Sequence, residues 1–180
     1  MEIKNPIQEI LITEEEIKKR ITELSDAISK DYEGKVPSLV VVLSGSFIFA
    51  ADLVRELKVF VDINFIRASS YGESTVSCEN VQINEVRGFD PKGKDIIIIE
   101  DIIDSGRTLS CVREKFLKDG AKSVELCTLL DKPSRRVVDI KAKYTGFEIE
   151  DKFVVGYGLD YAYKYRQYPF VGVLKPEYYE

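Results

Sequence analysis

The sequence predicts an α/β fold: a mostly parallel twisted sheet flanked by helices, with a small hood built from the N- and C-terminal segments. The first observation behind this prediction is that apolar stretches of strand length alternate with longer segments of helical periodicity. The second is that residues 96–99 are four consecutive isoleucines, which is typical of a strand buried on both faces. The third is that residues 137–180 contain short strand-like stretches and loops, which we assign to the hood together with residues 1–12.

Length and composition favour one domain over residues 1–180, with its core at about residues 37–135. The chain has 180 residues, of which 44% are hydrophobic, and this is enough to bury a sizeable core. A formal net charge of −5 gives no basic footprint for nucleic acid. No apolar run approaches a membrane span and the N-terminus lacks a signal pattern, so we expect a cytoplasmic protein with no membrane or nucleic-acid partner.

Two residue types limit the possible chemistry. The chain has no histidine, which excludes Ser–His and Cys–His nucleophilic systems and His-ligated metals. Proton transfer must therefore fall to carboxylate, Lys, Tyr or Cys side chains. Cys78, Cys111 and Cys127 are widely spaced, form no zinc pattern and suggest a reducing compartment. We expect each of them to be a small buried apolar residue.

The first element is a helix over residues 14–31. Thr13 and Glu16 have the spacing of a capping box at its start. Apolar residues then recur at helical spacing, namely Ile17, Ile21, Leu24 and Ile28. Strands are expected at residues 38–43, 59–68, 81–86, 96–101 and 124–130, and further helices at 47–57 and from the end of the 96–101 strand to about Asp119.

Residues 69–80 differ from the rest of the chain. They are mostly small and polar and show no apolar period. A loop of this length is uncommon in a compact domain and is often a lid or a disordered segment. We therefore expect a long loop here, with Ser70 and Tyr71 near its start.

The most informative stretch follows the four isoleucines. Two adjacent carboxylates, Glu100 and Asp101, end the strand, and Asp104 precedes the donor-rich residues 105–108. Ligands of open α/β sheets bind at the carboxyl ends of strands, and N–H groups at a helix start favour phosphate. An N-cap needs one acid, whereas three acids within five positions would be costly if buried unpaired. The stretch therefore indicates a phosphorylated sugar held with Mg²⁺, which takes carboxylate and phosphate oxygens.

These residues resemble a known signature. Residues 96–108 read as four apolar residues, two acids, two apolar residues and Asp-Ser-Gly-x-Thr, which resembles the phosphoribosyl-pyrophosphate (PRPP) signature of the type I phosphoribosyltransferase family. Within that family, the order and spacing of several other segments resemble the hypoxanthine (hypoxanthine-guanine) phosphoribosyltransferases. These segments are residues 43–49, 70–72, 131–136, 146–149 and 152–161, with Arg166 shortly after, and the resemblance covers about residues 37–174.

The resemblance implies how PRPP would be held. Its 5′-phosphate would lie on four consecutive residues, Ser105, Gly106, Arg107 and Thr108. Glu100 and Asp101 would meet the ribose hydroxyls, directly or through Mg²⁺ and water, and Asp160 would help to hold a metal through water. All three carboxylates are thus implied metal-site residues.

The resemblance also implies where pyrophosphate would leave. Arg166 and the turn at Ser44 and Gly45 would contact it, and Ser70 and Tyr71 would belong to a loop that closes over the reaction. The family commonly has Lys or Arg where this chain has Ser44, so a possible cationic contact is missing. The backbone N–H groups of the turn remain available.

For the purine base, the resemblance implies four contacts. Asp104 would lie near N7 and manage its proton, and Lys132 would donate to the 6-oxo group. Phe153 would stack on the base, and the backbone of Val154 would read its edge. A donor at Lys132 favours a 6-oxopurine over a 6-aminopurine, because adenine would present donor to donor.

The implied function is purine salvage: transfer of the 5-phosphoribosyl group from PRPP to N9 of hypoxanthine, and of guanine as well, by a Mg²⁺-dependent homodimer or homotetramer. Two alternatives stay open. One is a phosphoribosyltransferase that prefers xanthine. The other is a PRPP-sensing regulator that binds nucleic acid, against which the acidic net charge counts.

Overall fold

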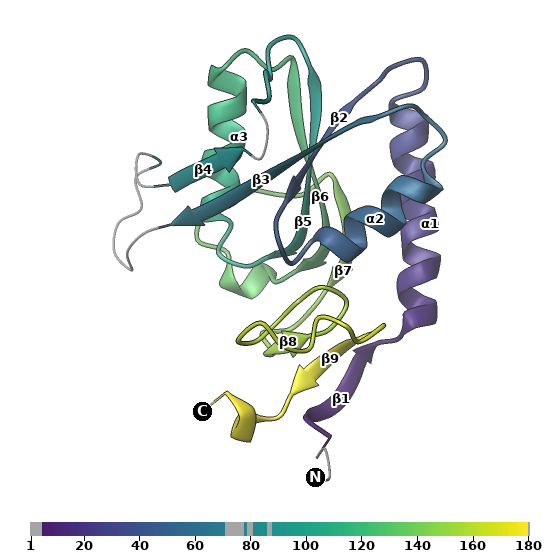
Figure 1. The fold of residues 1–180 in the computed structure, drawn as a ribbon, viewed down its shortest axis with the longest axis vertical. Coiled ribbons are helices and arrows are strands. Elements are labelled where there is room, and N and C mark those ends of the chain that lie inside the picture. The colour runs from purple at the N-terminus through teal and green to yellow at the C-terminus, as the bar shows by residue number, and fades with distance from the viewer. Residues whose placement is uncertain (1–4, 71–77, 79–80, 86–87, 180) are drawn as a thin grey trace.

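The computed structural model of the chain describes residues 5–70, 78, 81–85 and 88–179, which contain two sheets (Figure 1). The larger sheet has six strands in the order β4-β3-β2-β5-β6-β7. These strands are β2 (Ser38–Val42), β3 (Asp62–Ser70), β4 (Val81–Glu85), β5 (Asp95–Ile103), β6 (Ser123–Asp131) and β7 (Tyr144–Glu148). Neighbouring strands are parallel except at the edge, where β4 is antiparallel to β3, so the predicted mostly parallel sheet is confirmed.

Three described α-helices cover the two faces of this sheet. Helices α1 (Glu14–Asp31) and α2 (Phe47–Glu56) pack on one face, and α3 (Arg107–Lys118) packs on the other (Figure 1). The isoleucines of β5 divide between the layers: Ile97 and Ile99 belong to the cluster with α1 and α2, whereas Ile96 and Ile98 belong to the cluster with α3. All four are fully buried, which explains why this strand is apolar at consecutive positions.

The N-terminus of α1 is as the sequence predicts. Thr13 Oγ1 accepts a hydrogen bond from the Glu16 backbone N–H, and the Glu16 carboxylate accepts one from the Thr13 backbone N–H. These two bonds satisfy donors that have no partner within the helix. No described helix is long and apolar enough to cross a membrane.

The smaller sheet is antiparallel and joins distant parts of the chain. It consists of β1 (Ile7–Ile12), β9 (Val171–Leu174) and β8 (Val154–Val155), in the order β1-β9-β8. We call this sheet and the segment between β8 and β9 the hood. Figure 1 shows it at one end of the larger sheet. The strand β7 falls in the range expected for the hood but pairs in parallel with β6, so that part of the expectation is wrong.

Two expected element boundaries also need correction. Strand β5 continues beyond Glu100 and Asp101 to Ile103, because its ladder with β6 extends to Asp131. The strand β3 runs to Ser70 and pairs there with Val81, so the first two residues of the expected 69–80 loop are strand. Tyr71 lies outside the described residues.

Candidate active site

A cavity of about 290 Å³ opens at the carboxyl ends of β2 and β5. The turn after β2, the end of β5 and the start of α3 form its wall. The predicted residues that line it are Ser44, Gly45, Glu100, Asp101, Asp104, Ser105, Gly106 and Thr108. Segments far apart in sequence meet here because parallel strands place their carboxyl ends at one edge of the sheet.

The turn after β2 is tightly placed against the acidic pair. The peptide bond between Leu43 and Ser44 is cis, and the hydroxyl of Ser46 donates to Val42 O at 2.5 Å. A Cβ atom added to Gly45 would lie 1.5 Å from Asp101 Oδ2. Position 45 therefore excludes any side chain while Asp101 keeps its position.

Glu100 and Asp101 are adjacent, partly buried carboxylates. The Asp101 N–H donates to Glu100 Oε1 at 3.1 Å, and the Ile102 N–H donates to Asp101 Oδ1 at 2.7 Å. Burial and the neighbouring Asp101 carboxylate raise the pKa of Glu100 well above its ordinary value. Burial also raises the pKa of Asp101, although hydrogen bonds and the charge of Arg166 oppose this. The pair therefore favours a bound counter-charge.

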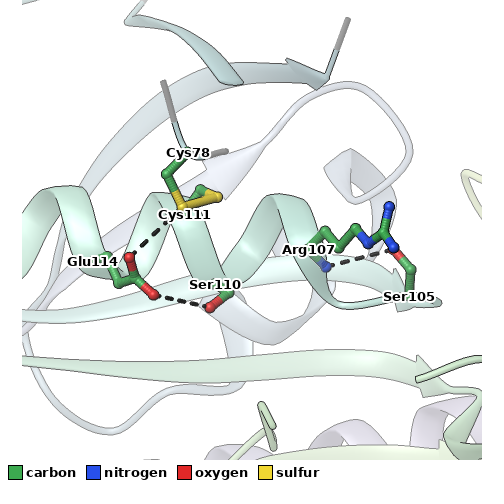
Figure 2. The surroundings of a disulfide bond; sticks show 6 residues. All are labelled: Cys78, Ser105, Arg107, Ser110, Cys111 and Glu114. Atoms are coloured by element: carbon green, nitrogen blue, oxygen red, sulfur yellow. Dashed lines mark hydrogen bonds between the residues drawn. A yellow bond between two sulfur atoms is a disulfide. The ribbon is translucent and has the colours of Figure 1, made fainter. Parts of the chain in front are cut away.

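The donor-rich segment begins α3. Ser105, Gly106 and Thr108 line the cavity, whereas Arg107 opens the helix and its N–H points to Ser105 Oγ at 3.4 Å (Figure 2). The first N–H groups of a helix have no partner within it, and the helix dipole favours an anion at this end. This part of the cavity suits a phosphate group.

A disulfide joins Cys78 to Cys111 beside this helix (Figure 2). Cys111 lies on α3, and Cys78 lies in the connection between β3 and β4. Glu114 Oε2 is 3.6 Å from the Cys78 sulfur. Cys127 is buried as expected, but Cys78 is exposed, so the expectation of a small buried apolar residue is wrong for Cys78. Sequence spacing gave no sign of the pairing, because the two residues are 33 positions apart.

Lys132 lies beside the end of β5 and is largely enclosed. Only 8% of its surface is exposed. Its ammonium group donates to Lys152 O at 2.7 Å and lies 3.4 Å from Asp151 Oδ1. The backbone N–H of Lys132 donates to Ile103 O at 3.0 Å, which fixes the residue against the strand that carries the acids. The structure thus places Lys132 next to the Asp104 loop.

Phe153 keeps an exposed ring among other aromatic residues. Its ring stacks on Tyr179 with centroids 4.4 Å apart and meets Tyr161 edge-on at 5.6 Å. The exposed fraction is 39%, which leaves surface for a further ring. Val154 is buried in β8. The partner Tyr179 could not be foreseen, because it lies at the far end of the chain.

Arg166 and Asp160 form an ion pair in the hood. Arg166 Nη2 is 2.7 Å from Asp160 Oδ1, and Arg166 Nη1 donates to Gly158 O at 2.6 Å. A Cβ atom on Gly158 would lie 2.1 Å from Gly45 O, so this segment of the hood touches the turn after β2. The structure therefore brings Arg166 close to the acidic pair. Asp160 forms its ion pair with Arg166.

Two charged residues at the site, Arg135 and Asp151, are not identified as site residues by the sequence. Arg135 Nε donates to Asp104 Oδ1 at 3.0 Å, and Arg135 Nη1 donates to Asp151 Oδ2 at 3.3 Å. The sequence marked residues 131–136 only as a basic turn. Asp104 and Asp151 lie 31 and 16 positions from Arg135, and no local sequence pattern reveals contacts over such separations.

The acidic pair fits a divalent cation. Two enclosed carboxylates repel each other, and a hard cation takes oxygen ligands of this kind. Mg²⁺ usually keeps waters and uses one or two carboxylates together with substrate phosphates, so a complete protein cage is not needed. In the described part of the chain, no group of three acidic or Cys side chains is placed to hold a metal alone.

Comparison with known proteins gives consistent matches. Residues 8–162 match the phosphoribosyl transferase domain family. The chain is 49% identical over 178 residues to the hypoxanthine-guanine phosphoribosyltransferase of Bacillus subtilis (strain 168), covering 99% of each chain. It is 49% identical over 166 residues to the hypoxanthine phosphoribosyltransferase of Escherichia coli (strain K12), covering 91% of this chain and 93% of the relative. A solved hypoxanthine phosphoribosyltransferase from Staphylococcus aureus superposes with a TM-score of 0.90 at 41% identity, covering 99% of this chain and 100% of that one.

Proposed function

The chain belongs to the phosphoribosyl transferase domain family, and from this premise we propose that it is a purine salvage enzyme. It transfers the 5-phosphoribosyl group of PRPP to N9 of hypoxanthine and releases inosine monophosphate and pyrophosphate. Guanine is a second substrate and gives guanosine monophosphate. The observation that carries this proposal is that the cavity at the ends of β2 and β5 is lined both by the carboxylates Glu100 and Asp101 and by the start of α3.

The phosphoribosyl group binds at the helix start and the acidic pair. The N–H groups and hydroxyls of residues 105–108 hold the 5′-phosphate. Glu100 and Asp101 meet the ribose hydroxyls, directly or through Mg²⁺ and water. The cation would be held by these carboxylates together with PRPP oxygens, and when bound it supplies positive charge near the departing pyrophosphate.

The reaction breaks the bond from ribose C1 to pyrophosphate and forms a bond from C1 to purine N9. Charge builds on the leaving oxygens as an oxocarbenium-like sugar develops, so fixed donors at that place lower the barrier. The N–H groups of the turn at Gly45 and the guanidinium of Arg166 are such donors. Asp104 accepts the proton that the base loses at N7 as N9 becomes bonded.

The base is read by side chains on the other side of Asp104. The ammonium of Lys132 donates to the 6-oxo group, and the exposed ring of Phe153 stacks on the purine. The backbone of Val154 reads the base edge. The near-complete enclosure of Lys132 supports this role, since a donor kept from water discriminates more strongly than a solvated one.

We also propose that the enzyme acts in the cytoplasm as a homodimer or homotetramer. Phe60, Ile63 and Phe65 expose 88%, 42% and 42% of their surfaces near or on β3, which supports a contact between subunits there. Sedimentation velocity over a range of concentrations should give a mass of two or four chains. A single-chain mass at every concentration would contradict this.

A base panel tests the proposed function. Hypoxanthine, guanine, xanthine and adenine are each incubated with PRPP and Mg²⁺, and the products are identified by mass. We expect inosine and guanosine monophosphates as the main products, and no turnover in excess chelator. Absence of product with every 6-oxopurine would reject the function, and undiminished activity in chelator would reject the role of the metal. A nucleic-acid binding assay on the same protein tests the regulator alternative.

A further inference from the structure

Four charged side chains of alternating sign form a chain along the base side of the site. They are Asp104, Arg135, Asp151 and Lys132. Arg135 Nε donates to Asp104 at 3.0 Å and Arg135 Nη1 donates to Asp151 at 3.3 Å. The second oxygen of Asp151 faces Lys132 Nζ at 3.4 Å. Each inner member therefore contacts two neighbours of opposite charge.

The two inner members use their geometry fully. The planar guanidinium of Arg135 contacts two carboxylates from different segments, which a single ammonium group could not do as well. Asp151 uses one oxygen for Arg135 and the other for Lys132. At Asp104, Arg135 contacts Oδ1, and among the described residues Oδ2 has no hydrogen-bond partner, which leaves it free to face a substrate.

The backbone holds the same segments together. The Lys132 N–H donates to Ile103 O, and the Val137 N–H donates to Ser105 O at 3.1 Å. The Arg135 contact to Asp104 lies between these two bonds, so the basic turn runs along the loop that carries Asp104. Arg135 thus adds side-chain order where the backbone is already aligned.

We infer that Arg135 and Asp151 are positioning residues that fix the separation between Asp104 and Lys132. This inference rests on the proposed function, in which these two outer residues contact N7 and the 6-oxo group of the purine. N7 and O6 lie on one edge of the base, so its recognition needs a proton acceptor and a donor at a set spacing. The two inner residues touch no part of the substrate and act through the outer two.

A surface ion pair alone would have little effect. The side chains of Arg135 and Asp104 are 53% and 46% exposed, and pairs of this kind contribute little to stability. The positioning role predicts a different pattern, in which folding is unchanged but the base is held incorrectly. Small displacements of reacting groups are costly to rate, up to about 100-fold for about 1 Å.

The experiment compares Arg135→Gln, Arg135→Lys, Asp151→Asn and the double variant Arg135→Gln/Asp151→Asn in steady-state assays. For Arg135→Gln we expect kcat/KM for hypoxanthine to fall about tenfold and the preference over adenine to shrink, with the KM for PRPP within about twofold of wild type. Arg135→Lys should remain within about threefold of Arg135→Gln, since it keeps the charge but not the fork. The double variant should lose about as much as either single change, because the residues act as one unit.

Arg55→Gln is the matched control. Arg55 is an exposed arginine that also pairs with an aspartate, Asp52, but it lies on α2 outside the cavity lining. We expect wild-type kinetics and a wild-type melting temperature for this variant. Melting temperatures of the Arg135 and Asp151 variants should likewise stay within a few degrees of wild type.

The outcomes separate this inference from the function on which it rests. If the wild type converts hypoxanthine but Arg135→Gln keeps kcat/KM within twofold, the positioning role is wrong and the function stands. Three other results would also overturn the role. They are wild-type kcat/KM in Arg135→Lys, strictly additive losses in the double variant, and a KM for PRPP that rises by as much as kcat/KM for hypoxanthine falls. A wild type that converts no 6-oxopurine would overturn both.

Discussion

The two halves of the site balance charge in opposite ways. In the phosphate half, Glu100 and Asp101 place like charges side by side, and the pKa of Glu100 is raised by burial and by its neighbour. In the base half, Asp104, Arg135, Asp151 and Lys132 alternate in sign and neutralise one another without a ligand. The phosphate half is therefore prepared for a counter-charge, whereas the base half is ordered before the base arrives.

The halves also differ in what builds them. Strand ends, a tight turn and a helix start form the phosphate half, so most of its positions follow from one sheet edge. Ion pairs between three separate segments form the base half: the loop at Asp104, the turn at residues 131–136 and the segment before Phe153. Substitutions should expose this difference, since backbone crowding should damage one half and loss of a side-chain group the other.

The largest effect is expected at Asp104, where the halves meet. Asp104→Asn keeps the shape but cannot accept the N7 proton. We expect kcat to fall by about 10²–10⁴-fold, the usual contribution of general acid–base catalysis, with PRPP binding nearly unchanged. Single-turnover kinetics and PRPP titration measure the two quantities. A kcat within a few fold of wild type would reject Asp104 as the base.

The next largest effect is expected in the turn after β2, where two substitutions compare the need for close backbone approach at Gly45 with the contribution of the Ser44 side chain. In Gly45→Ala the new Cβ must displace Asp101, because it would lie 1.5 Å from Asp101 Oδ2. We expect kcat/KM to fall by about 100-fold, the cost of a small misplacement near the reacting atoms. Ser44→Ala is the control and should stay within about tenfold, since one neutral hydrogen bond contributes about 0.5–1.5 kcal/mol. Equal effects of the two changes would show that the turn does not depend on close backbone approach.

The phosphate half has a covalent link that a third prediction tests. Under oxidising conditions the Cys78–Cys111 bond closes a segment of the chain with a sequence separation of 33. Cys78→Ser should then lower the free energy of unfolding by about 2–4 kcal/mol, the usual range for a native disulfide. In excess reductant the wild type and the variant should unfold alike. Thiol titration of the denatured, oxidised protein should find only Cys127 free, and three free thiols would contradict the bond.

A substitution at Lys132 tests the base half of the site. Lys132→Ala removes the donor proposed for the 6-oxo group and leaves Asp151 with Arg135 as its partner. A hydrogen bond to a charged group contributes about 1.5–3 kcal/mol, so kcat/KM for hypoxanthine should fall by roughly 10- to 100-fold. Discrimination against adenine should fall with it, while the KM for PRPP stays near wild type. Unchanged selectivity in the base panel would show that another group reads the oxo position.

The contrast between the halves also explains what the sequence could predict. The capping box at Thr13, the buried β5 and the acids beside the start of α3 are local patterns, and the structure has them in the expected places. The Arg135 contacts, the stacking of Tyr179 on Phe153 and the disulfide all join residues that are distant in sequence. Their partners depend on how loops and the hood pack, which residue spacing does not encode. The sequence also did not predict the pairing of β7 with β6, because a short strand at the edge of the larger sheet differs little in sequence from a short strand of the hood.

The smallest effect is expected on stability, and it compares a carboxylate of the phosphate half, Glu100, with a carboxylate of the base half, Asp151. Folding raises the pKa of Glu100 above 4.5, its ordinary value, so the folded protein binds this proton more tightly than the unfolded chain does. As the pH rises from about 4.5 through the raised pKa, ionisation therefore destabilises the ligand-free protein, and the penalty is constant at higher pH. Glu100→Gln removes this penalty and keeps an oxygen for the Asp101 N–H.

At pH 7 the Glu100→Gln variant should be more stable than wild type, because the folded wild type there bears the penalty of ionising Glu100 beside Asp101. The gain should vanish as the pH falls toward 4.5. Asp151→Asn in the base half should give no such gain, because it takes a carboxylate away from two cations. Denaturant unfolding of the three proteins at pH 7 and at pH 5 measures these differences. If Glu100→Gln is less stable than wild type at pH 7, the acidic pair is not a site of charge repulsion, and the two halves do not differ in the way described.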